Sequence, residues 1–89
     1  MPEIKLLVRN KVGLHARPAA LFVQMANNFK SNIEVIYGDT IANAKSILSV
    51  LTLGANQGAT VTVRADGEDA EEALQSIADL FESNFNESE

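Results

Sequence analysis

The residue with the clearest chemistry is His15, the only histidine of the 89-residue chain. The neutral form of histidine is well populated near pH 7, and a neutral imidazole nitrogen is a good nucleophile for phosphorus. Arg17 follows two residues later, and its planar guanidinium can hold two phosphate oxygens at once. The pair is compatible with a site that accepts a phosphoryl group on His15. From these residues alone, the alternative is that His15 is only a helix cap or a surface residue.

The neighbours of His15 predict that its ring stands at the start of a helix. Gly13 supplies a turn before it, and Pro18 suits the first helical turn, where a missing N–H costs least. A helix start presents unpaired N–H groups and the positive end of the helix dipole to an anion. We therefore expect the backbone amides of Ala16 and Arg17 to donate to the phosphoryl oxygens.

The elements that must position this loop follow from the spacing of apolar residues. Strict alternation predicts strands within residues 4–8, 33–37, 40–42 and 61–65. Helical spacing predicts helices over about 16–29 and from about 70 onward, with Asn10 and Lys11 in the turn before the first and residues 66–69 capping the second. The polar tail after Asn84, residues 86–89 in particular, is expected to fray.

Residues 47–53 are ambiguous, because five of the seven are apolar and fit either a buried strand or a short helix. The borders favour a helix. Ser46 stands where an N-cap belongs, and Gly54 stands where a left-handed C-terminal residue belongs.

The resulting order βαββαβα predicts an α+β fold with a single domain over residues 1–89. Alternating strands bury one face and leave the other in water, so a four-stranded, largely antiparallel sheet should carry three helices on one face. This is an open-faced two-layer sandwich.

Composition excludes several other classes. The chain has no cysteine and one histidine, so it predicts no disulfide, no metal site and no cofactor, and it fits the cytoplasm. The net charge of −5 argues against nucleic-acid binding, and the first ten residues are too weakly apolar for a targeting segment or membrane insertion. The charge is uneven, because residues 66–89 carry nine acids and no base whereas the His15 end is locally positive.

Two separated motifs resemble one known family. Residues 13–19 read GLHARPA and residues 45–54 read KSILSVLTLG, similar to the phosphorylation loop and the regulatory-serine helix of the HPr family. These proteins are histidine-containing phosphocarriers of the bacterial sugar phosphotransferase system. The likeness also covers chain length and element order, and the clearest departure lies at residues 38–44, GDTIANA.

The resemblance implies a monomeric carrier rather than an enzyme. His15 would be phosphorylated on Nδ1 by Enzyme I at the expense of phosphoenolpyruvate, with Arg17 stabilising the phosphate, and the group would pass to Enzyme II A domains. Ser46 would be phosphorylated by an HPr kinase/phosphorylase, and a transcriptional regulator would be a further partner. From the residues alone, Ser46 needs no role beyond capping its helix.

The short helix has more apolar residues than one stripe can bury. We expect Val50 and Leu53 to point inward. The remaining ones would surround His15 as a docking patch made of Ala20, Gln24, Ile47, Leu48 and Leu51. The alternative is that all the apolar residues of this helix belong to the core.

Two other functions remain open. One is a purely regulatory module of the same fold, which acts through phosphorylation of Ser46; the presence of His15 and Arg17 argues against that as the sole role. The other is a small hydrolase that uses His15 as a base, which is disfavoured because no serine or carboxylate nucleophile has a recognisable spacing to it.

Overall fold

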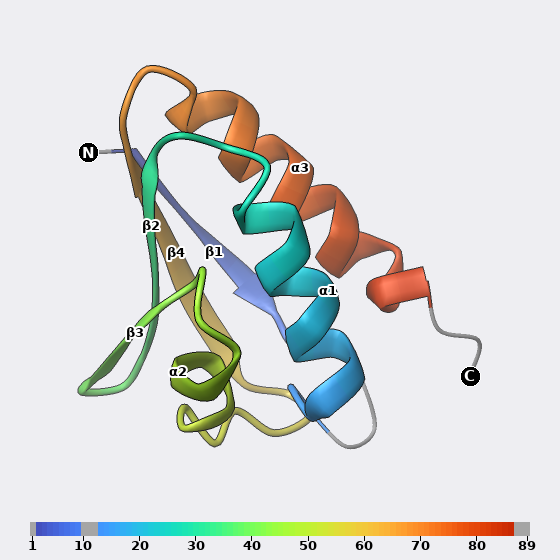
Figure 1. Ribbon diagram of the computed structural model, residues 1–89. Helices are drawn as coiled ribbons and strands as arrows, with labels where there is room; N and C mark the ends of the chain where they lie inside the picture. The colour runs from blue at the N-terminus through green and yellow to red at the C-terminus, as the bar shows by residue number, and fades with distance from the viewer. Residues whose placement is uncertain (1, 10–12, 87–89) are drawn as a thin grey trace.

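The computed structural model describes residues 2–9 and 13–86. The chain folds in the predicted order βαββαβα, followed by a short 3-10 helix (Figure 1). The elements are β1 (Glu3–Leu7), α1 (Ala16–Ala26), β2 (Asn32–Tyr37), β3 (Thr40–Asn43), α2 (Ile47–Leu51), β4 (Thr60–Asp66), α3 (Ala70–Glu82) and η1 (Asn84–Asn86).

The four strands form one sheet in the order β1-β4-β2-β3, and every neighbouring pair is antiparallel. β2 and β3 are joined by a two-residue turn, in which Gly38 has the positive φ of +60° that such tight hairpins need. Backbone bonds between Val8 and the 58–59 turn extend the pairing of β1 with β4 toward the His15 loop. The predicted antiparallel sheet is confirmed.

Alternation decides which face of the sheet the helices cover. Val61, Val63 and Ala65 of β4 are buried, whereas the residues between them are partly exposed. In Figure 1, α1 and α3 lie side by side across one face, and α2 sits at its lower end. Phe22 of α1 packs edge-on against Phe81 of α3, with ring centroids 5.5 Å apart, so an aromatic contact joins the two long helices.

Two helix ends differ from the sequence prediction. α1 ends at Ala26 rather than near Phe29, because Asn27 caps it: its amide nitrogen Nδ2 donates to the carbonyl oxygen of Val23 at 2.9 Å. The chain after α3 does not fray at Asn84. Instead, η1 buries Phe85 against Phe81, with ring centroids 4.7 Å apart. Residues 87–89 of the predicted tail lie outside the described residues.

The turn before α3 is also different from the prediction. Asp69 is the N-cap residue, but its side chain does not cap α3. The carboxylate accepts hydrogen bonds from the backbone N–H groups of Lys30 at 2.8 Å and Ser31 at 2.9 Å, and from the buried hydroxyl of Ser31. Asp69 therefore ties the turn before α3 to the start of β2.

These bonds make the stability of the fold sensitive to acid. The Ser31 hydroxyl and the Lys30 amide hold the pKa of Asp69 at about 2, below its ordinary value of 3.8. Stabilisation by this carboxylate is therefore complete above about pH 4 and is lost as the pH falls through about 2. We expect the free energy of unfolding of Asp69→Asn, measured by urea titration, to fall less steeply over this range than that of the wild type.

Glu68→Gln is the matched control, because it removes a neighbouring exposed carboxylate. This variant should keep the wild-type slope. If the free energy of unfolding falls equally steeply with pH in Asp69→Asn and in the wild type, the Asp69 contacts do not contribute to the acid sensitivity of the fold.

Candidate functional site

His15 stands at the start of α1. It is the N-cap residue, with an extended backbone (φ −80°, ψ −170°), and its carbonyl oxygen accepts the N–H of Ala19 at 2.9 Å, the first hydrogen bond of the helix. The side chain is partly exposed and makes no capping bond to the helix. The ring is thus at the surface, at the opening turn of the helix, and outside the hydrophobic core.

The first turn of α1 leaves two backbone donors without acceptors in the helix. The His15 N–H donates to the carbonyl oxygen of Gly13 at 3.0 Å, and Pro18 has no N–H. The N–H groups of Ala16 and Arg17 remain, because an α-helix offers its first amides no acceptor. No acidic residue occupies this turn. The arrangement suits an anion carried by the His15 ring.

The loop before His15 is held by the turn after α2. The N–H of Leu14 donates to the carbonyl oxygen of Ala55 at 3.0 Å, and Leu14 is buried. Gly13 has a φ of +71°, and a Cβ atom there would lie 2.3 Å from the same oxygen. Only glycine fits this approach. Asn10 and Lys11, the other predicted turn residues, lie outside the described residues.

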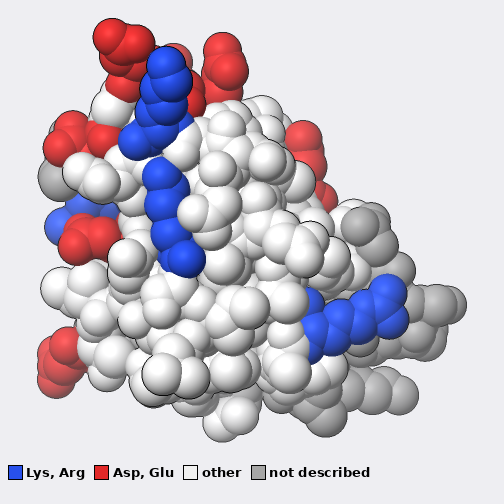
Figure 2. Space-filling view, in the orientation of Figure 1, with Lys and Arg blue, Asp and Glu red and all other residues white. Residues whose placement is uncertain are grey.

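Arg17 is exposed, and within the described part of the chain it forms no ion pair. Figure 2 shows acidic side chains gathered at the upper end of the molecule, over the turn between β4 and α3, while the surface below them is largely neutral. Among the residues that the structure describes, no carboxylate therefore neutralises the Arg17 guanidinium.

The segment 47–53 is helical, as its borders predict, although α2 ends at Leu51. The hydroxyl of Ser46 accepts the N–H of Ser49 at 3.4 Å, so Ser46 is the N-cap. Gly54 follows the helix with a φ of +67°, the left-handed conformation that its position predicts. Ser46 is partly exposed.

The apolar residues of this segment separate into two groups. Val50 and Leu53 are buried, as predicted. Ile47, Leu48 and Leu51 are exposed, with relative accessibilities of 44%, 76% and 39%, so they are not core residues. On α1, which contacts α2, Gln24 is exposed and Ala20 is partly buried. We call Ala20, Gln24, Ile47, Leu48 and Leu51 the α2 patch.

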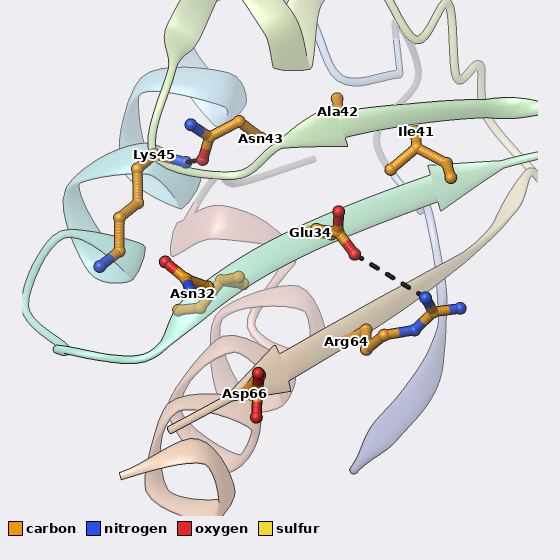
Figure 3. Close-up of a pocket in the computed structure, with 9 residues that line it drawn as sticks. Asn32, Glu34, Ile41, Ala42, Asn43, Lys45, Arg64 and Asp66 are labelled. Atoms are coloured by element: carbon orange, nitrogen blue, oxygen red, sulfur yellow. Dashed lines mark hydrogen bonds and ion pairs between the residues drawn. The ribbon is translucent and has the colours of Figure 1, made fainter. Parts of the chain in front are cut away.

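A hollow of about 460 Å³ lies elsewhere, on the open face of the sheet (Figure 3). Its lining includes Asn32, Asn43 and the pair Glu34–Arg64, whose charged atoms are 3.8 Å apart, but neither His15 nor Arg17. In residues 2–9 and 13–86 no cluster of acidic or histidine side chains could hold a metal ion. None of the helices in this part of the chain has the length and apolar content of a membrane span. The His15 site is a surface site rather than a closed pocket.

One contributor could not have been found from sequence. Ala55 holds the His15 loop through its backbone oxygen, and an alanine carries no side-chain signal for such a role. The accepting carbonyl is specified by how the turn after α2 packs on Gly13.

Known proteins are similar to this chain in sequence and fold. The family model described as "PTS HPr component phosphorylation site" matches residues 2–83. The chain is 47% identical over 87 residues to the phosphocarrier protein HPr of Xylella fastidiosa, which covers 98% of each chain. It is also 47% identical over 78 residues to the HPr-like protein Crh of Bacillus subtilis, covering 88% of this chain and 92% of Crh.

Among solved structures, the crystal structure of HPr-C-His from Thermoanaerobacter tengcongensis superposes with a TM-score of 0.96, at 48% identity and with full coverage of both chains. The family that these matches define is a class of phosphoryl carrier rather than of enzyme. The chain belongs to the HPr family of phosphocarrier proteins and has the HPr fold.

Proposed function

We propose that this chain carries a phosphoryl group on His15 between two proteins of the sugar phosphotransferase system. Enzyme I, charged by phosphoenolpyruvate, would donate the group, and Enzyme II A domains would accept it. The observation that carries the proposal is the position of His15: a surface ring at a helix start, beside the amides of Ala16 and Arg17. The cytoplasm, where phosphoenolpyruvate is made, is the proposed compartment, and the monomer is the proposed form.

The geometry suits reversible transfer. The lone pair of Nδ1, the nitrogen that the family uses, attacks the phosphorus atom while the bond from phosphorus to the donor breaks. The negative oxygens then lie against the two amides and the positive end of α1, and the Arg17 guanidinium holds them further. The charge on the phosphoryl oxygens is therefore stabilised by groups of this chain alone.

The direct test is incubation with Enzyme I and phosphoenolpyruvate, followed by intact-protein mass spectrometry. We expect one added phosphoryl group, labile in acid and stable in alkali, which His15→Ala abolishes. A group that persists in His15→Ala would place the acceptor elsewhere and overturn the proposal.

The α2 patch is the proposed docking surface for both partners. Exposed apolar side chains beside a reactive group are typical of protein interfaces. We expect Leu48→Ser to raise the KM of Enzyme I for this chain about tenfold, the size of a loss at an interface hot spot. Because Leu48 is exposed, the free energy of unfolding of the Leu48→Ser variant should differ from that of the wild type by less than about 0.5 kcal/mol.

Leu7→Ser is the matched control, since Leu7 is also exposed, at 51%, but lies on β1 away from α2. Steady-state kinetics measure the KM of Enzyme I for both variants. The same KM for Leu48→Ser and Leu7→Ser would remove Leu48 from the docking surface.

Regulation through Ser46 is a second proposed role. It is supported by the position of Ser46 as a partly exposed N-cap beside the α2 patch and by the similarity to Crh, a Bacillus subtilis protein described as a catabolite repression HPr. An HPr kinase/phosphorylase would add the phosphate, and a transcriptional regulator would read it. A phosphate at this helix start is tolerated by the fold but places about two negative charges beside the patch.

We therefore expect Ser46→Asp to slow phosphorylation of His15 by several-fold, because charge at the rim of an interface changes the rate of association. Ser46→Asn is the control, because asparagine and aspartate cap helices equally well and differ in charge. Stopped-flow or quench kinetics should show the wild-type rate for Ser46→Asn. A wild-type rate for both variants would exclude this role.

A further inference from the structure

The segment that carries α2 is tied to α1 at both ends. At the His15 end, the N–H of Leu14 donates to the carbonyl oxygen of Ala55, and Gly13 packs against the same turn. The second tie lies at the opposite end of α1 and involves residues 27–29 and 43–45. No part of this second tie belongs to the His15 site.

The second tie consists of side chains bonded to backbone. Asn27 Nδ2 donates to the carbonyl oxygen of Lys45 at 3.3 Å as well as to that of Val23. In return, the ammonium of Lys45 donates to the carbonyl oxygen of Phe29 at 2.7 Å. The N–H of Lys45 donates to Asn43 Oδ1 at 2.9 Å, the contact drawn in Figure 3, where the Lys45 side chain extends away from β3.

The charge of Lys45 suits this position. α1 has no basic residue in its last turn, and the carbonyl end of a helix favours a cation. Lys45 supplies that cation from another part of the chain. The bond to Phe29 is partly buried and charge-assisted, so water competes with it less than with an exposed pair.

The second tie holds the orientation of α2, because α2 is too short to be stable on its own. Lys45 directly precedes Ser46, the N-cap, and a helix of five residues has little stability of its own. Within the helix, only Val50 is fully buried. The direction of its exposed face therefore depends on what holds its two ends.

We infer that Lys45 and Asn27 are positioning residues for phosphoryl transfer. By holding the turn before α2 on the carbonyl end of α1, they set the α2 patch at a fixed place relative to the His15 ring. A partner bound to the α2 patch then has its own reacting group correctly placed relative to the His15 ring. The inference rests on the proposed function, but neither residue touches the phosphoryl group, since α1 separates them from His15 by about 16 Å.

The kinetic test uses Lys45→Met, which keeps the side-chain stem and removes the ammonium. We expect the KM of Enzyme I for this variant to rise roughly three- to tenfold with kcat within about twofold, because docking is misaligned while the nucleophile is intact. Asn27→Ala should act in the same direction. Lys45→Arg should restore the wild-type KM, since a guanidinium can donate to the same carbonyl.

Lys30→Met is the matched control, because it removes one positive charge from the segment after the carbonyl end of α1 without removing a bond to the turn before α2. The KM of Enzyme I for Lys30→Met should stay within about twofold of its KM for the wild type. Equal increases for Lys30→Met and Lys45→Met would mean that charge alone matters and would overturn the inference.

A second measurement does not depend on Enzyme I. Residual dipolar couplings of backbone amides report the direction of α2 relative to α1 in solution. In Lys45→Met the couplings of Ile47–Leu51 should change as a group while those of α1 stay constant. Unchanged couplings in Lys45→Met would overturn the inference even if His15 accepts a phosphoryl group. A wild-type chain that takes no phosphoryl group would instead refute the proposed function, and altered couplings in Lys45→Met would still show that Lys45 sets the direction of α2.

Discussion

Replacing Arg17 with alanine is expected to lower kcat/KM for phosphorylation of His15 by Enzyme I roughly a hundredfold, the loss typical of removing one donor to a developing anion. The guanidinium is exposed and unpaired within residues 2–9 and 13–86, so its charge is available to the phosphoryl oxygens. For the same reason the free energy of unfolding should change by less than about 0.5 kcal/mol. Rapid-quench kinetics with phosphoenolpyruvate as donor measure the effect.

Two variants show what the guanidinium contributes. Arg17→Lys keeps the charge but loses the planar fork, so it should recover only part of the rate. Lys5→Ala removes one positive charge from the exposed side of β1 and should leave the rate unchanged. A wild-type rate in Arg17→Ala would exclude Arg17 from phosphate stabilisation.

The second large effect is expected at Gly13. In Gly13→Ala the new Cβ would lie 2.3 Å from the carbonyl oxygen of Ala55 and 2.8 Å from the Cα of Asn56, both backbone atoms. The loop must shift, and a displacement of about 1 Å at a reacting group can cost up to a hundredfold in rate. We expect phosphorylation of His15 to slow at least tenfold and the free energy of unfolding to fall by about 2 kcal/mol.

Gly54→Ala separates this collision from backbone strain. Gly54 has a φ of +67°, close to the +71° of Gly13, but open space surrounds its missing Cβ. The control should therefore cost about 1 kcal/mol of stability and leave the rate near that of the wild type. Equal rates for the two alanine variants would show that the contact between Gly13 and the Ala55 turn does not position His15.

Much of the fold could be predicted from sequence because the local signals agree with the tertiary structure. Alternation in β4 matches the burial of Val61, Val63 and Ala65, and Ser46 caps α2 as its position predicts. In the site, the sequence predicted a helix start at His15, and the structure places His15 at the N-cap of α1. These features depend on residues near one another in the chain.

The features that the sequence did not reveal depend on distant partners. α1 stops at Ala26 because Asn27 turns to Val23 and to Lys45, 18 residues away. Asp69 leaves its own helix to bind Lys30 and Ser31, which alternation and capping rules do not anticipate.

The environment of Phe85 was mispredicted for a related reason. Phe85 follows a polar stretch, so its environment suggested a frayed tail. In the folded chain, Asn84 and Phe85 adopt positive φ values of 55° and 56°, which return the ring to the aromatic contact with Phe81. Burial of a large apolar side chain offsets the unfavourable backbone conformation.

The central claim is that a phosphoryl group on the His15 ring lies against the first amides of α1. Backbone amide NMR before and after phosphorylation by Enzyme I measures this most directly. The amide resonances of Ala16 and Arg17 should move further than those of any other residue in α1, because a new acceptor faces them. If the ring becomes phosphorylated while those two amides stay in place, the helix start does not hold the phosphate and the account is contradicted.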